Sequence, residues 1–138
     1  LIAGTYAGST VGMAVGTRII ERLELEGYLG PEGRVAGLGG RFERRLNSFC
    51  KRMPGCIGQR SGIGAMQAFV PFDGSQQVVS AIVHRAFEEG LMVFSAGSNP
   101  TKIRMLPPLN TTDEELEACF TMLEKAMRRV AEKCELPC

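Results

Sequence analysis

Residues 102–115 read Lys-Ile-Arg-Met-Leu-Pro-Pro-Leu-Asn-Thr-Thr-Asp-Glu-Glu, and this stretch decides how the rest of the chain is organised. Ile103 and Met105 alternate with Arg104 and Leu106, which is the period of a β-strand with one buried face. The two prolines that follow have no N–H group to donate to a neighbouring strand, so they end this strand. The sequence therefore predicts a short strand that carries an arginine and stops at Leu106.

A helix follows this strand almost at once. Thr112 and Glu115 have the spacing of a capping box, in which each side chain accepts a hydrogen bond from the backbone N–H of the other residue. The apolar positions that follow recur every three or four residues, as expected for a helix packed on a core. These positions are Leu116, Cys119, Phe120, Leu123, Met127 and Val130.

Arg104 has two interpretations when only its spacing is considered. A surface residue is the plainer one, because the long apolar stem of an arginine lets its guanidinium reach water from a strand. The other is a binding residue that presents its charge to a ligand. The residues alone leave both open.

The length and charge of the chain limit the functions that it can have. A length of 138 residues allows one domain with a real core. Lys and Arg number 16 against 15 Asp and Glu, with two Tyr and no Trp, so we expect no nucleic-acid partner. No stretch approaches the ~18 apolar residues of a membrane span, so we expect no membrane partner either.

The cysteines and the histidine give no metal site. The five cysteines are an odd number without C-x-x-C spacing, and the single His84 leaves no second imidazole for a metal ion. We therefore expect no metal, and reduced thiols in a cytoplasmic protein. The cysteines are Cys50, Cys56, Cys119, Cys134 and Cys138.

The first residues form a glycine-rich and hydroxyl-rich loop before a helix. The chain begins in mid-pattern at Leu1 without a Met, which suggests a piece of a longer protein. Spare N–H groups at a helix start favour a phosphate, but the pattern of residues 4–9 also occurs in plain turns, and both readings stay open. Gly12 and Gly16 lie one helical turn apart, which predicts a close crossing with another element.

A second helix is expected to begin at Pro31 and to end near Met53. One face carries an apolar stripe from Val35 to Phe49. The other face holds six cations against only two glutamates, which is either a patch for a polyanion or, more plainly, a solvated face. These cations are Arg34, Arg41, Arg44, Arg45, Lys51 and Arg52.

The middle of the chain supplies the remaining strands. Glycines divide residues 56–72 into one bent or two short strands, and Asp73-Gly74 forms the turn that follows. Ser75 caps a third helix whose apolar stripe ends at Phe87. Residues 91–95 read as a short buried strand, and residues 101–106 as its hairpin partner. The order of elements predicts an α+β fold, a two-layer sandwich of a small antiparallel or mixed sheet packed by helices.

Two segments resemble a known family. The Ile-Arg-Met-Leu-Pro-Pro-Leu-Asn-Thr-Thr of residues 103–112, running into an acidic helix, resembles the closing segment of class III pyridoxal-phosphate aminotransferases, the acetylornithine, ornithine and 4-aminobutyrate aminotransferase group. In that family the arginine of this motif holds a substrate carboxylate, a role that the resemblance gives to Arg104. This motif is the more specific of the two.

The second segment is the Gly-Thr-Tyr-Ala-Gly of residues 4–8. It is similar to a family segment whose threonine binds the phosphate of pyridoxal 5'-phosphate in the partner subunit's active site, which gives a cofactor-binding role to Thr5. The family usually continues with Asn-Pro, whereas this chain has Ser9-Thr10. The resemblance therefore supports the phosphate-binding role of Thr5 better than it supports any detail of the turn that follows.

The resemblance also implies a domain organisation, because the order of elements looks like the C-terminal small domain of fold-type I pyridoxal-phosphate enzymes. Residues 1–30 would be the phosphate-loop segment and connecting helix of an absent large domain, and residues 31–138 the C-terminal small domain. The family's Schiff-base lysine lies well before the threonine loop, so this chain lacks it. We expect no catalytic residue here and no activity from the chain alone.

The expected function is that of a C-terminal fragment of an aminotransferase. The parent would transfer an amino group from an amine or amino acid to a 2-oxo acid through pyridoxal 5'-phosphate, as a homodimer. The alternative is a free-standing α+β binding or dimerisation module without a cofactor. An upstream reading frame with the family's aspartate and lysine would favour the first; a start codon just before Leu1 would favour the second.

Overall fold

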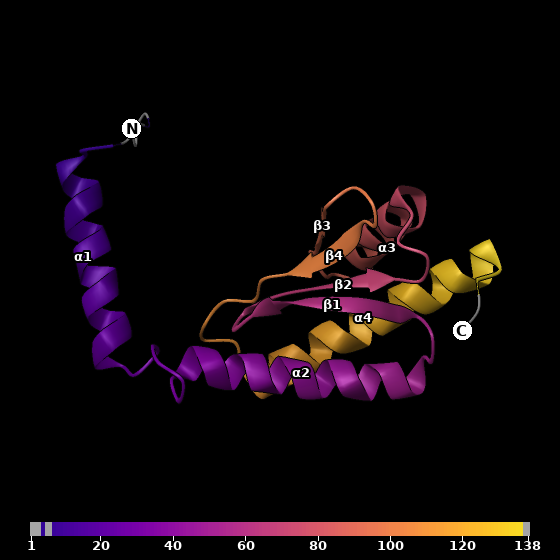
Figure 1. The fold of residues 1–138 in the computed structure, drawn as a ribbon, viewed down its shortest axis with the longest axis horizontal. Helices are drawn as coiled ribbons and strands as arrows, with labels where there is room; N and C mark the ends of the chain where they lie inside the picture. The colour runs from indigo at the N-terminus through magenta and orange to yellow at the C-terminus, as the bar shows by residue number, and fades with distance from the viewer. Residues whose placement is uncertain (1–3, 5–6, 137–138) are drawn as a thin grey trace.

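The computed structural model describes residue 4 and residues 7–136 of the chain (Figure 1). Two helices, two strands, a helix, two strands and a last helix follow one another, in the order that the sequence predicts. The helices are α1 (Thr10–Leu25), α2 (Arg34–Arg52), α3 (Gln76–Glu88) and α4 (Asp113–Cys134). The strands are β1 (Ile57–Ile63), β2 (Met66–Pro71), β3 (Phe94–Ala96) and β4 (Lys102–Met105).

The strands form one antiparallel sheet in the order β1-β2-β4-β3. The glycine-interrupted region folds into the β1–β2 hairpin, which turns at Gly64, a residue with φ +54. β4 then enters between β2 and β3, so the last two strands also pair with each other. The prediction of an α+β fold is confirmed, and of the two sheet types it allowed the antiparallel one is found.

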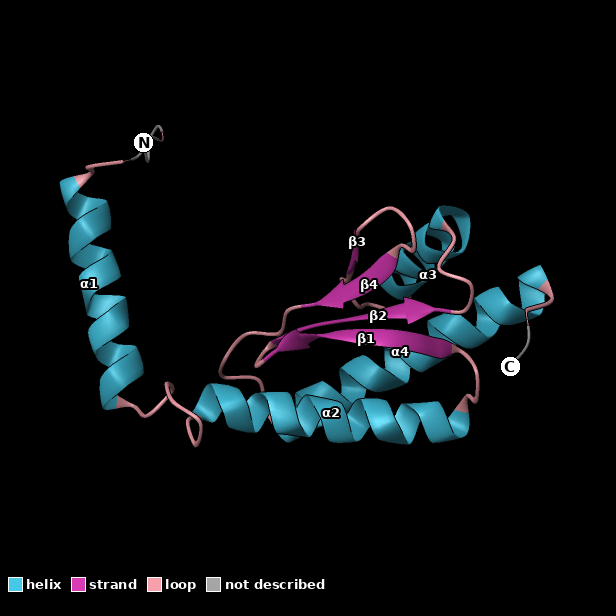
Figure 2. Cartoon of the chain, viewed as in Figure 1, coloured by secondary structure: helices cyan, strands magenta, loops and turns pink. Residues whose placement is uncertain are grey.

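Helices α2, α3 and α4 cover one face of this sheet (Figure 2). Ile103 and Met105 of β4 point into this core and are 0% and 6% exposed, whereas Arg104 between them is exposed. Phe120 of α4 lies in the middle of the core, with its ring edge-on to Phe42 at 5.0 Å and to Phe49 at 6.2 Å between centroids. The strand alternation read from the sequence is therefore correct.

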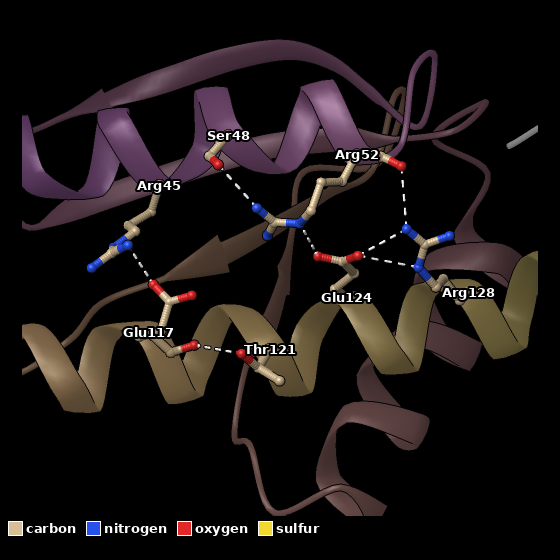
Figure 3. Close-up of polar contacts among 7 residues, drawn as sticks. All are labelled: Arg45, Ser48, Arg52, Glu117, Thr121, Glu124 and Arg128. Carbon is tan, nitrogen blue, oxygen red and sulfur yellow. Dashed lines mark hydrogen bonds and ion pairs between the residues drawn. The ribbon is translucent and has the colours of Figure 1, made fainter.

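Ion pairs join α2 to α4 along their outer edges (Figure 3). Arg45 pairs with Glu117 at 2.5 Å and Arg52 with Glu124 at 2.7 Å between nitrogen and oxygen. Farther towards the N-termini of both helices, Arg41 of α2 pairs with Asp113 of α4 at 3.3 Å. In each of these three pairs the arginine comes from α2 and the acid from α4, so much of the basic face of α2 is neutralised within the chain.

The members of each pair stand 72 residues apart in the sequence. A constant offset requires two helices that run in the same direction, and Figure 1 shows α2 and α4 running the same way. We call these three pairs the α2–α4 ladder.

Glu124 is the most buried acid of the ladder and accepts from a second arginine. Arg128 donates to Glu124 Oε1 at 2.8 Å and to the carbonyl oxygen of Arg52 at 3.2 Å. Burial by itself would raise the pKa of the Glu124 carboxyl, but the hydrogen bonds from Arg128 and Arg52 outweigh it, and the pKa is lowered. The carboxylate is therefore held in its charged form at neutral pH.

Helix α1 differs from the other three helices because none of its residues is buried. In Figure 1 it rises at a steep angle to α2 and stands apart from the sheet. A methyl group added at Gly16 would meet nothing within 4 Å, so the close crossing predicted at this glycine stripe has no partner in the described part of the chain. Large apolar side chains on α1 are exposed: Val11, Met13, Val15, Ile19, Ile20 and Leu25.

Three details differ from the sequence reading. Helix α2 begins at Arg34, with Gly33 as its N-cap, rather than at Pro31. Strand β3 begins at Phe94, three residues later than expected. Phe87 lies at the end of α3 and is 65% exposed, so its assignment to the core was wrong.

Two kinds of feature are absent from the residues that the structure describes. None of their helices combines the length and apolar character needed to cross a membrane. Within the same residues, no group of three His, Cys, Asp or Glu side chains is placed to hold a metal ion.

Candidate functional site

Arg104 lies in the middle of the sheet, on the face that the helices leave uncovered. It stands directly opposite Ala68 of β2 on one side and Phe94 of β3 on the other. Directly paired residues in antiparallel strands point to the same face, so these three side chains share the uncovered face. We call this surface the open face of the sheet.

The guanidinium of Arg104 has an aromatic neighbour and no acidic one. Its central carbon lies 5.6 Å from the centroid of the Phe94 ring, within the range of a cation–π contact. Among the described residues, no carboxylate forms an ion pair with Arg104, although most other arginines of the chain have such a partner. The surface reading of Arg104 is thus correct as to exposure, but this arginine keeps its charge available.

Two hollows in the described part of the molecule lie elsewhere. One of about 720 Å³ opens between α1 and the turn at Leu109 and Asn110. Another of about 450 Å³ lies beside Pro107, and Cys119 lines it. Burial, and to a smaller degree the charge of Glu115, raise the pKa of the Cys119 thiol, so this cysteine is protonated at neutral pH. Arg104 lines neither hollow.

The other predicted site residue, Thr5, lies outside the described residues. The described end of its loop has one property that suits an anion, because α1 starts at Thr10 with no acid in its first turn. Gly8, just before it, has φ +81. Ser9 caps this helix by accepting a hydrogen bond from the backbone N–H of Gly12 at 3.2 Å. Other N–H groups of the first turn have no partner in the helix.

The start of α1 and the arginine strand are well separated. Figure 1 shows the first turn of α1 and strand β4 on opposite sides of the opening between α1 and the sheet. One copy of the chain therefore does not bring the described end of the threonine loop to Arg104.

Two residues beside Arg104 escaped the sequence reading. Phe94 was expected inside a buried strand, but it is 51% exposed and supports the guanidinium. No role was predicted for Lys102, yet its ammonium donates to the hydroxyl of Ser61 at 3.1 Å on the open face. Strand alternation was the available signal, since residues 102 and 104 must share a face.

This arrangement defines an α+β domain with an arginine on the uncovered face of its sheet that pairs with no carboxylate of the described residues. The chain belongs to the class III aminotransferase family, whose family model matches residues 2–127.

Relatives and solved structures agree with that assignment. The chain is 30% identical over 135 residues to 5-aminovalerate aminotransferase of Pseudomonas putida, covering 94% of this chain and 31% of the relative. A PLP-bound aminotransferase mutant from Vibrio fluvialis is 31% identical, with a TM-score of 0.72 over 89% of this chain and 27% of that one. Lysine aminotransferase from M. tuberculosis, in the internal aldimine form, shares the fold with a TM-score of 0.75 at 21% identity, over 94% of this chain and 28% of that one.

The chain thus spans about a third of the length of the curated relatives that it matches. Its fold is that of one part of these aminotransferases.

Proposed function

We propose that this chain is the C-terminal part of an aminotransferase that moves an amino group from an amine or amino acid to a 2-oxo acid. Arg104 would bind the substrate carboxylate. The observation that carries this role is the guanidinium of Arg104, which lies over Phe94 on the open face of the sheet and forms no ion pair with the residues that the structure describes. Membership of the class III family supports the activity.

Arg104 suits a carboxylate for a physical reason. A guanidinium offers two parallel N–H donors that match the two oxygens of a carboxylate, and it stays charged at any physiological pH. Met105 and Ile103 are buried on either side of it along β4, so the backbone at Arg104 is fixed by the core beneath. The chain would contribute a positioned charge that binds and orients the substrate.

Pyridoxal 5'-phosphate is the cofactor of this proposal, and it supplies the electron sink for amino-group transfer when bound. Thr5 would donate to its phosphate, in the partner subunit's site of a homodimer. The described N-terminal turn of α1 is compatible with such an anion because it carries no acidic residue. No lysine of this chain stands in the family's Schiff-base motif, so the chain alone should not catalyse the reaction.

A large domain would complete the protein. Residues 1–30 would belong to its phosphate-loop segment and connecting helix, and residues 31–138 would be the small domain packed on it. The exposed apolar side chains of α1 and of the open face support this arrangement, since exposed apolar surface of this kind marks an interaction site. On the open face and at its edge these side chains are Ile63, Met66, Phe94 and Leu106.

The cytoplasmic location belongs to the same proposal. It rests on the free thiols of Cys50, Cys119 and Cys134, which suit a reducing compartment.

The test is Arg104→Lys in the full-length enzyme. A lysine keeps the charge but cannot form the two parallel hydrogen bonds, so we expect substrate binding to weaken by about 1.5–3 kcal/mol, and kcat/KM to fall by roughly one to two decades. The melting temperature should stay the same, because the Arg104 side chain is exposed and points away from the core. Steady-state kinetics with donor and 2-oxo acid, and a melting curve on the same sample, give both quantities.

Arg44→Lys is the matched control, because Arg44 is an exposed arginine on the opposite side of the domain, on α2. It should have normal kinetics. Normal kcat/KM for both substrates of the Arg104→Lys enzyme would remove the carboxylate role. A lowered melting temperature with normal kinetics would make Arg104 a structural residue.

A further inference from the structure

Two neighbouring hollows follow the basic face of α2, which lies across the sheet from the open face. The larger, of about 630 Å³, opens between α2 and the turn at residues 109–112 that leads into α4. The smaller, of about 280 Å³, is lined by Ser48 farther along α2. Arg41 and Arg44 line both hollows, so the two form one groove. We call it the α2 groove.

Cations outnumber acids along the α2 groove. Among its described lining residues Asp113 is the single acid, and Arg41 already pairs with it at 3.3 Å. Arg45 is paired as well, with Glu117 of the α2–α4 ladder. The arginines that line the groove are Arg34, Arg41, Arg44 and Arg45.

Arg44 and Arg34 keep most of their charge available. Arg44 forms no ion pair with any residue that the structure describes. Glu26 lies 3.9 Å from Arg34, which is too long for a hydrogen bond, and it pairs more closely with Arg22 at 2.7 Å. The central carbon of Arg34 lies 4.3 Å from the centroid of the Tyr28 ring, which supports the guanidinium without neutralising it. The groove therefore carries a surplus of positive charge.

Glycines leave room between these arginines. Gly37 and Gly40 line the larger hollow. A methyl group added at Gly37 would meet nothing within 4 Å, and one added at Gly40 would meet only the Nη1 atom of Arg44, at 3.7 Å. The backbone of α2 is therefore an open floor on which a ligand can lie between the arginines.

Linked phosphates are the anions that suit this spacing. Arg41 and Arg44 stand one helical turn apart, and Arg34 stands seven residues before Arg41, about 10 Å away along the helix axis. A small anion meets one end of this row only, whereas a chain of phosphates presents acceptor oxygens along its whole length. The forked guanidinium of arginine binds phosphate oxygens two at a time.

We propose that the α2 groove binds a molecule with several linked phosphates. Arg34 and Arg44 hold the phosphates over the glycine floor, and the ligand competes with Asp113 for Arg41. A nucleoside triphosphate and an inorganic polyphosphate both present these groups. The groove is separate from the site of Arg104, so this inference does not rest on the proposed function.

The test is titration calorimetry of the full-length holoenzyme with inorganic tripolyphosphate and, separately, with ATP. At low salt we expect saturable binding of one tripolyphosphate per chain. Tighter binding of ATP would support the site with a nucleotide as its ligand, and ATP binding no tighter than tripolyphosphate would support it with phosphates alone. The absence of saturable binding of either would overturn the inference.

Three substitutions act on the groove in different ways. Arg44→Gln removes one charge and should weaken tripolyphosphate binding about tenfold. Gly37→Leu keeps every charge but fills the floor of the groove, and it should weaken binding at least as much. Both chains should keep their melting temperature, because Arg44 and Gly37 are exposed. Asp113→Asn removes the acid that competes for Arg41, so it should strengthen binding by roughly threefold.

Two controls separate a shaped site from a general attraction. Lys51→Gln removes an exposed cation of α2 that lines neither hollow, and Arg104→Gln removes the cation of the open face. Each should change tripolyphosphate binding by less than about twofold. A loss in Lys51→Gln or Arg104→Gln as large as in Arg44→Gln, or unchanged binding in Gly37→Leu, would overturn the α2 groove as the site. None of these results depends on whether Arg104 binds a substrate.

Discussion

The two faces of the sheet are built in opposite ways. On the covered face, side chains such as Ile103 and Phe120 are almost fully buried, and the arginines at its border are paired with acids of α4. On the open face, Arg104 and Lys102 have no carboxylate partner among the described residues, and Phe94 is half exposed. This difference indicates that the stability of the chain comes mainly from the face of the sheet that the helices cover. Substitutions on the covered face should therefore change the stability of the fold, and substitutions on the open face should change binding.

The sharpest way to break this comparison is to remove one phenylalanine from each face. Phe120→Ala should lower the free energy of unfolding by about 3–5 kcal/mol, since it leaves a cavity beside Phe42 and Phe49. Phe94→Ala should change it by less than about 0.5 kcal/mol, because half of that ring already meets solvent. Urea unfolding followed by circular dichroism measures both. Equal losses would mean that the open face also stabilises the fold.

The second prediction concerns the loop before α1, on the binding side of the comparison. In the full-length enzyme, Thr5→Ala should remove a charge-assisted hydrogen bond worth about 1.5–3 kcal/mol and weaken cofactor binding by roughly ten- to a hundredfold. Because the threonine would serve the partner subunit, mixed dimers with an enzyme inactive for another reason should recover one good site. Cofactor titration followed by absorbance measures the affinity. An unchanged affinity of the Thr5→Ala enzyme for the cofactor would mean that this loop is a plain turn without a phosphate-binding role.

The third prediction tests the covered side through its charges. Glu124→Gln should cost about 1–2 kcal/mol at neutral pH, because it replaces the acceptor shared by Arg52 and Arg128. The folded pKa of Glu124 lies below its ordinary value of 4.5, so its contribution is present above pH 4.5 and is lost as the pH falls through the folded value. Urea unfolding at neutral and at acid pH gives the difference.

Glu132→Gln is the control for this change, since Glu132 is an exposed acid of the same helix. It should shift stability by less than about 0.5 kcal/mol at either pH. If the natural chain and Glu124→Gln differ in free energy of unfolding by the same amount at neutral and at acid pH, the charge of Glu124 does not stabilise the fold.

The smallest expected effect lies at the start of α4. The hydroxyl of Thr112 accepts from the backbone N–H of Glu115 at 3.2 Å, and Glu115 accepts from Thr112 N–H at 2.9 Å. Thr112→Ala should cost about 1 kcal/mol of stability. Thr121→Ala, the same change in the exposed middle of the helix, should be neutral or slightly stabilising because alanine is the better helix former. Thermal unfolding compares the two.

The sequence predicted the features that depend on local rules. Strand alternation around Arg104, the capping box at Thr112 and the cap at Ser75 all depend on residues a few positions apart, and all three are found. The Asp73-Gly74 turn follows as well, with the Asp73 carboxylate accepting from the backbone N–H of Ser75 at 3.0 Å. Local chemistry decides such features before the chain is compact.

Features set by distant parts of the chain could not be predicted in this way. The acids that pair with Arg45 and Arg52 stand 72 residues later, so the basic face of α2 looked solvated. A methyl group at Gly39 of α2 would lie 2.9 Å from the carbonyl oxygen of Gly64, a close approach visible only once the β1–β2 hairpin lies on that helix. For the same reason Lys102 was not linked to Ser61 on a distant strand. These partners are determined by how the helices and strands pack against one another.

The constant 72-residue offset of the α2–α4 ladder has a consequence for how this domain can change its length. Each pair depends only on the spacing within its own helix. Residues gained or lost in the turns between Met53 and Thr112 would alter the offset equally for all pairs and leave every contact in place. One residue inserted inside α2 between Arg45 and Arg52 would instead rotate the later arginine by about 100° and remove it from Glu124, because a helix has 3.6 residues per turn. Natural variation in length should therefore concentrate in the turns of this domain and avoid both helices.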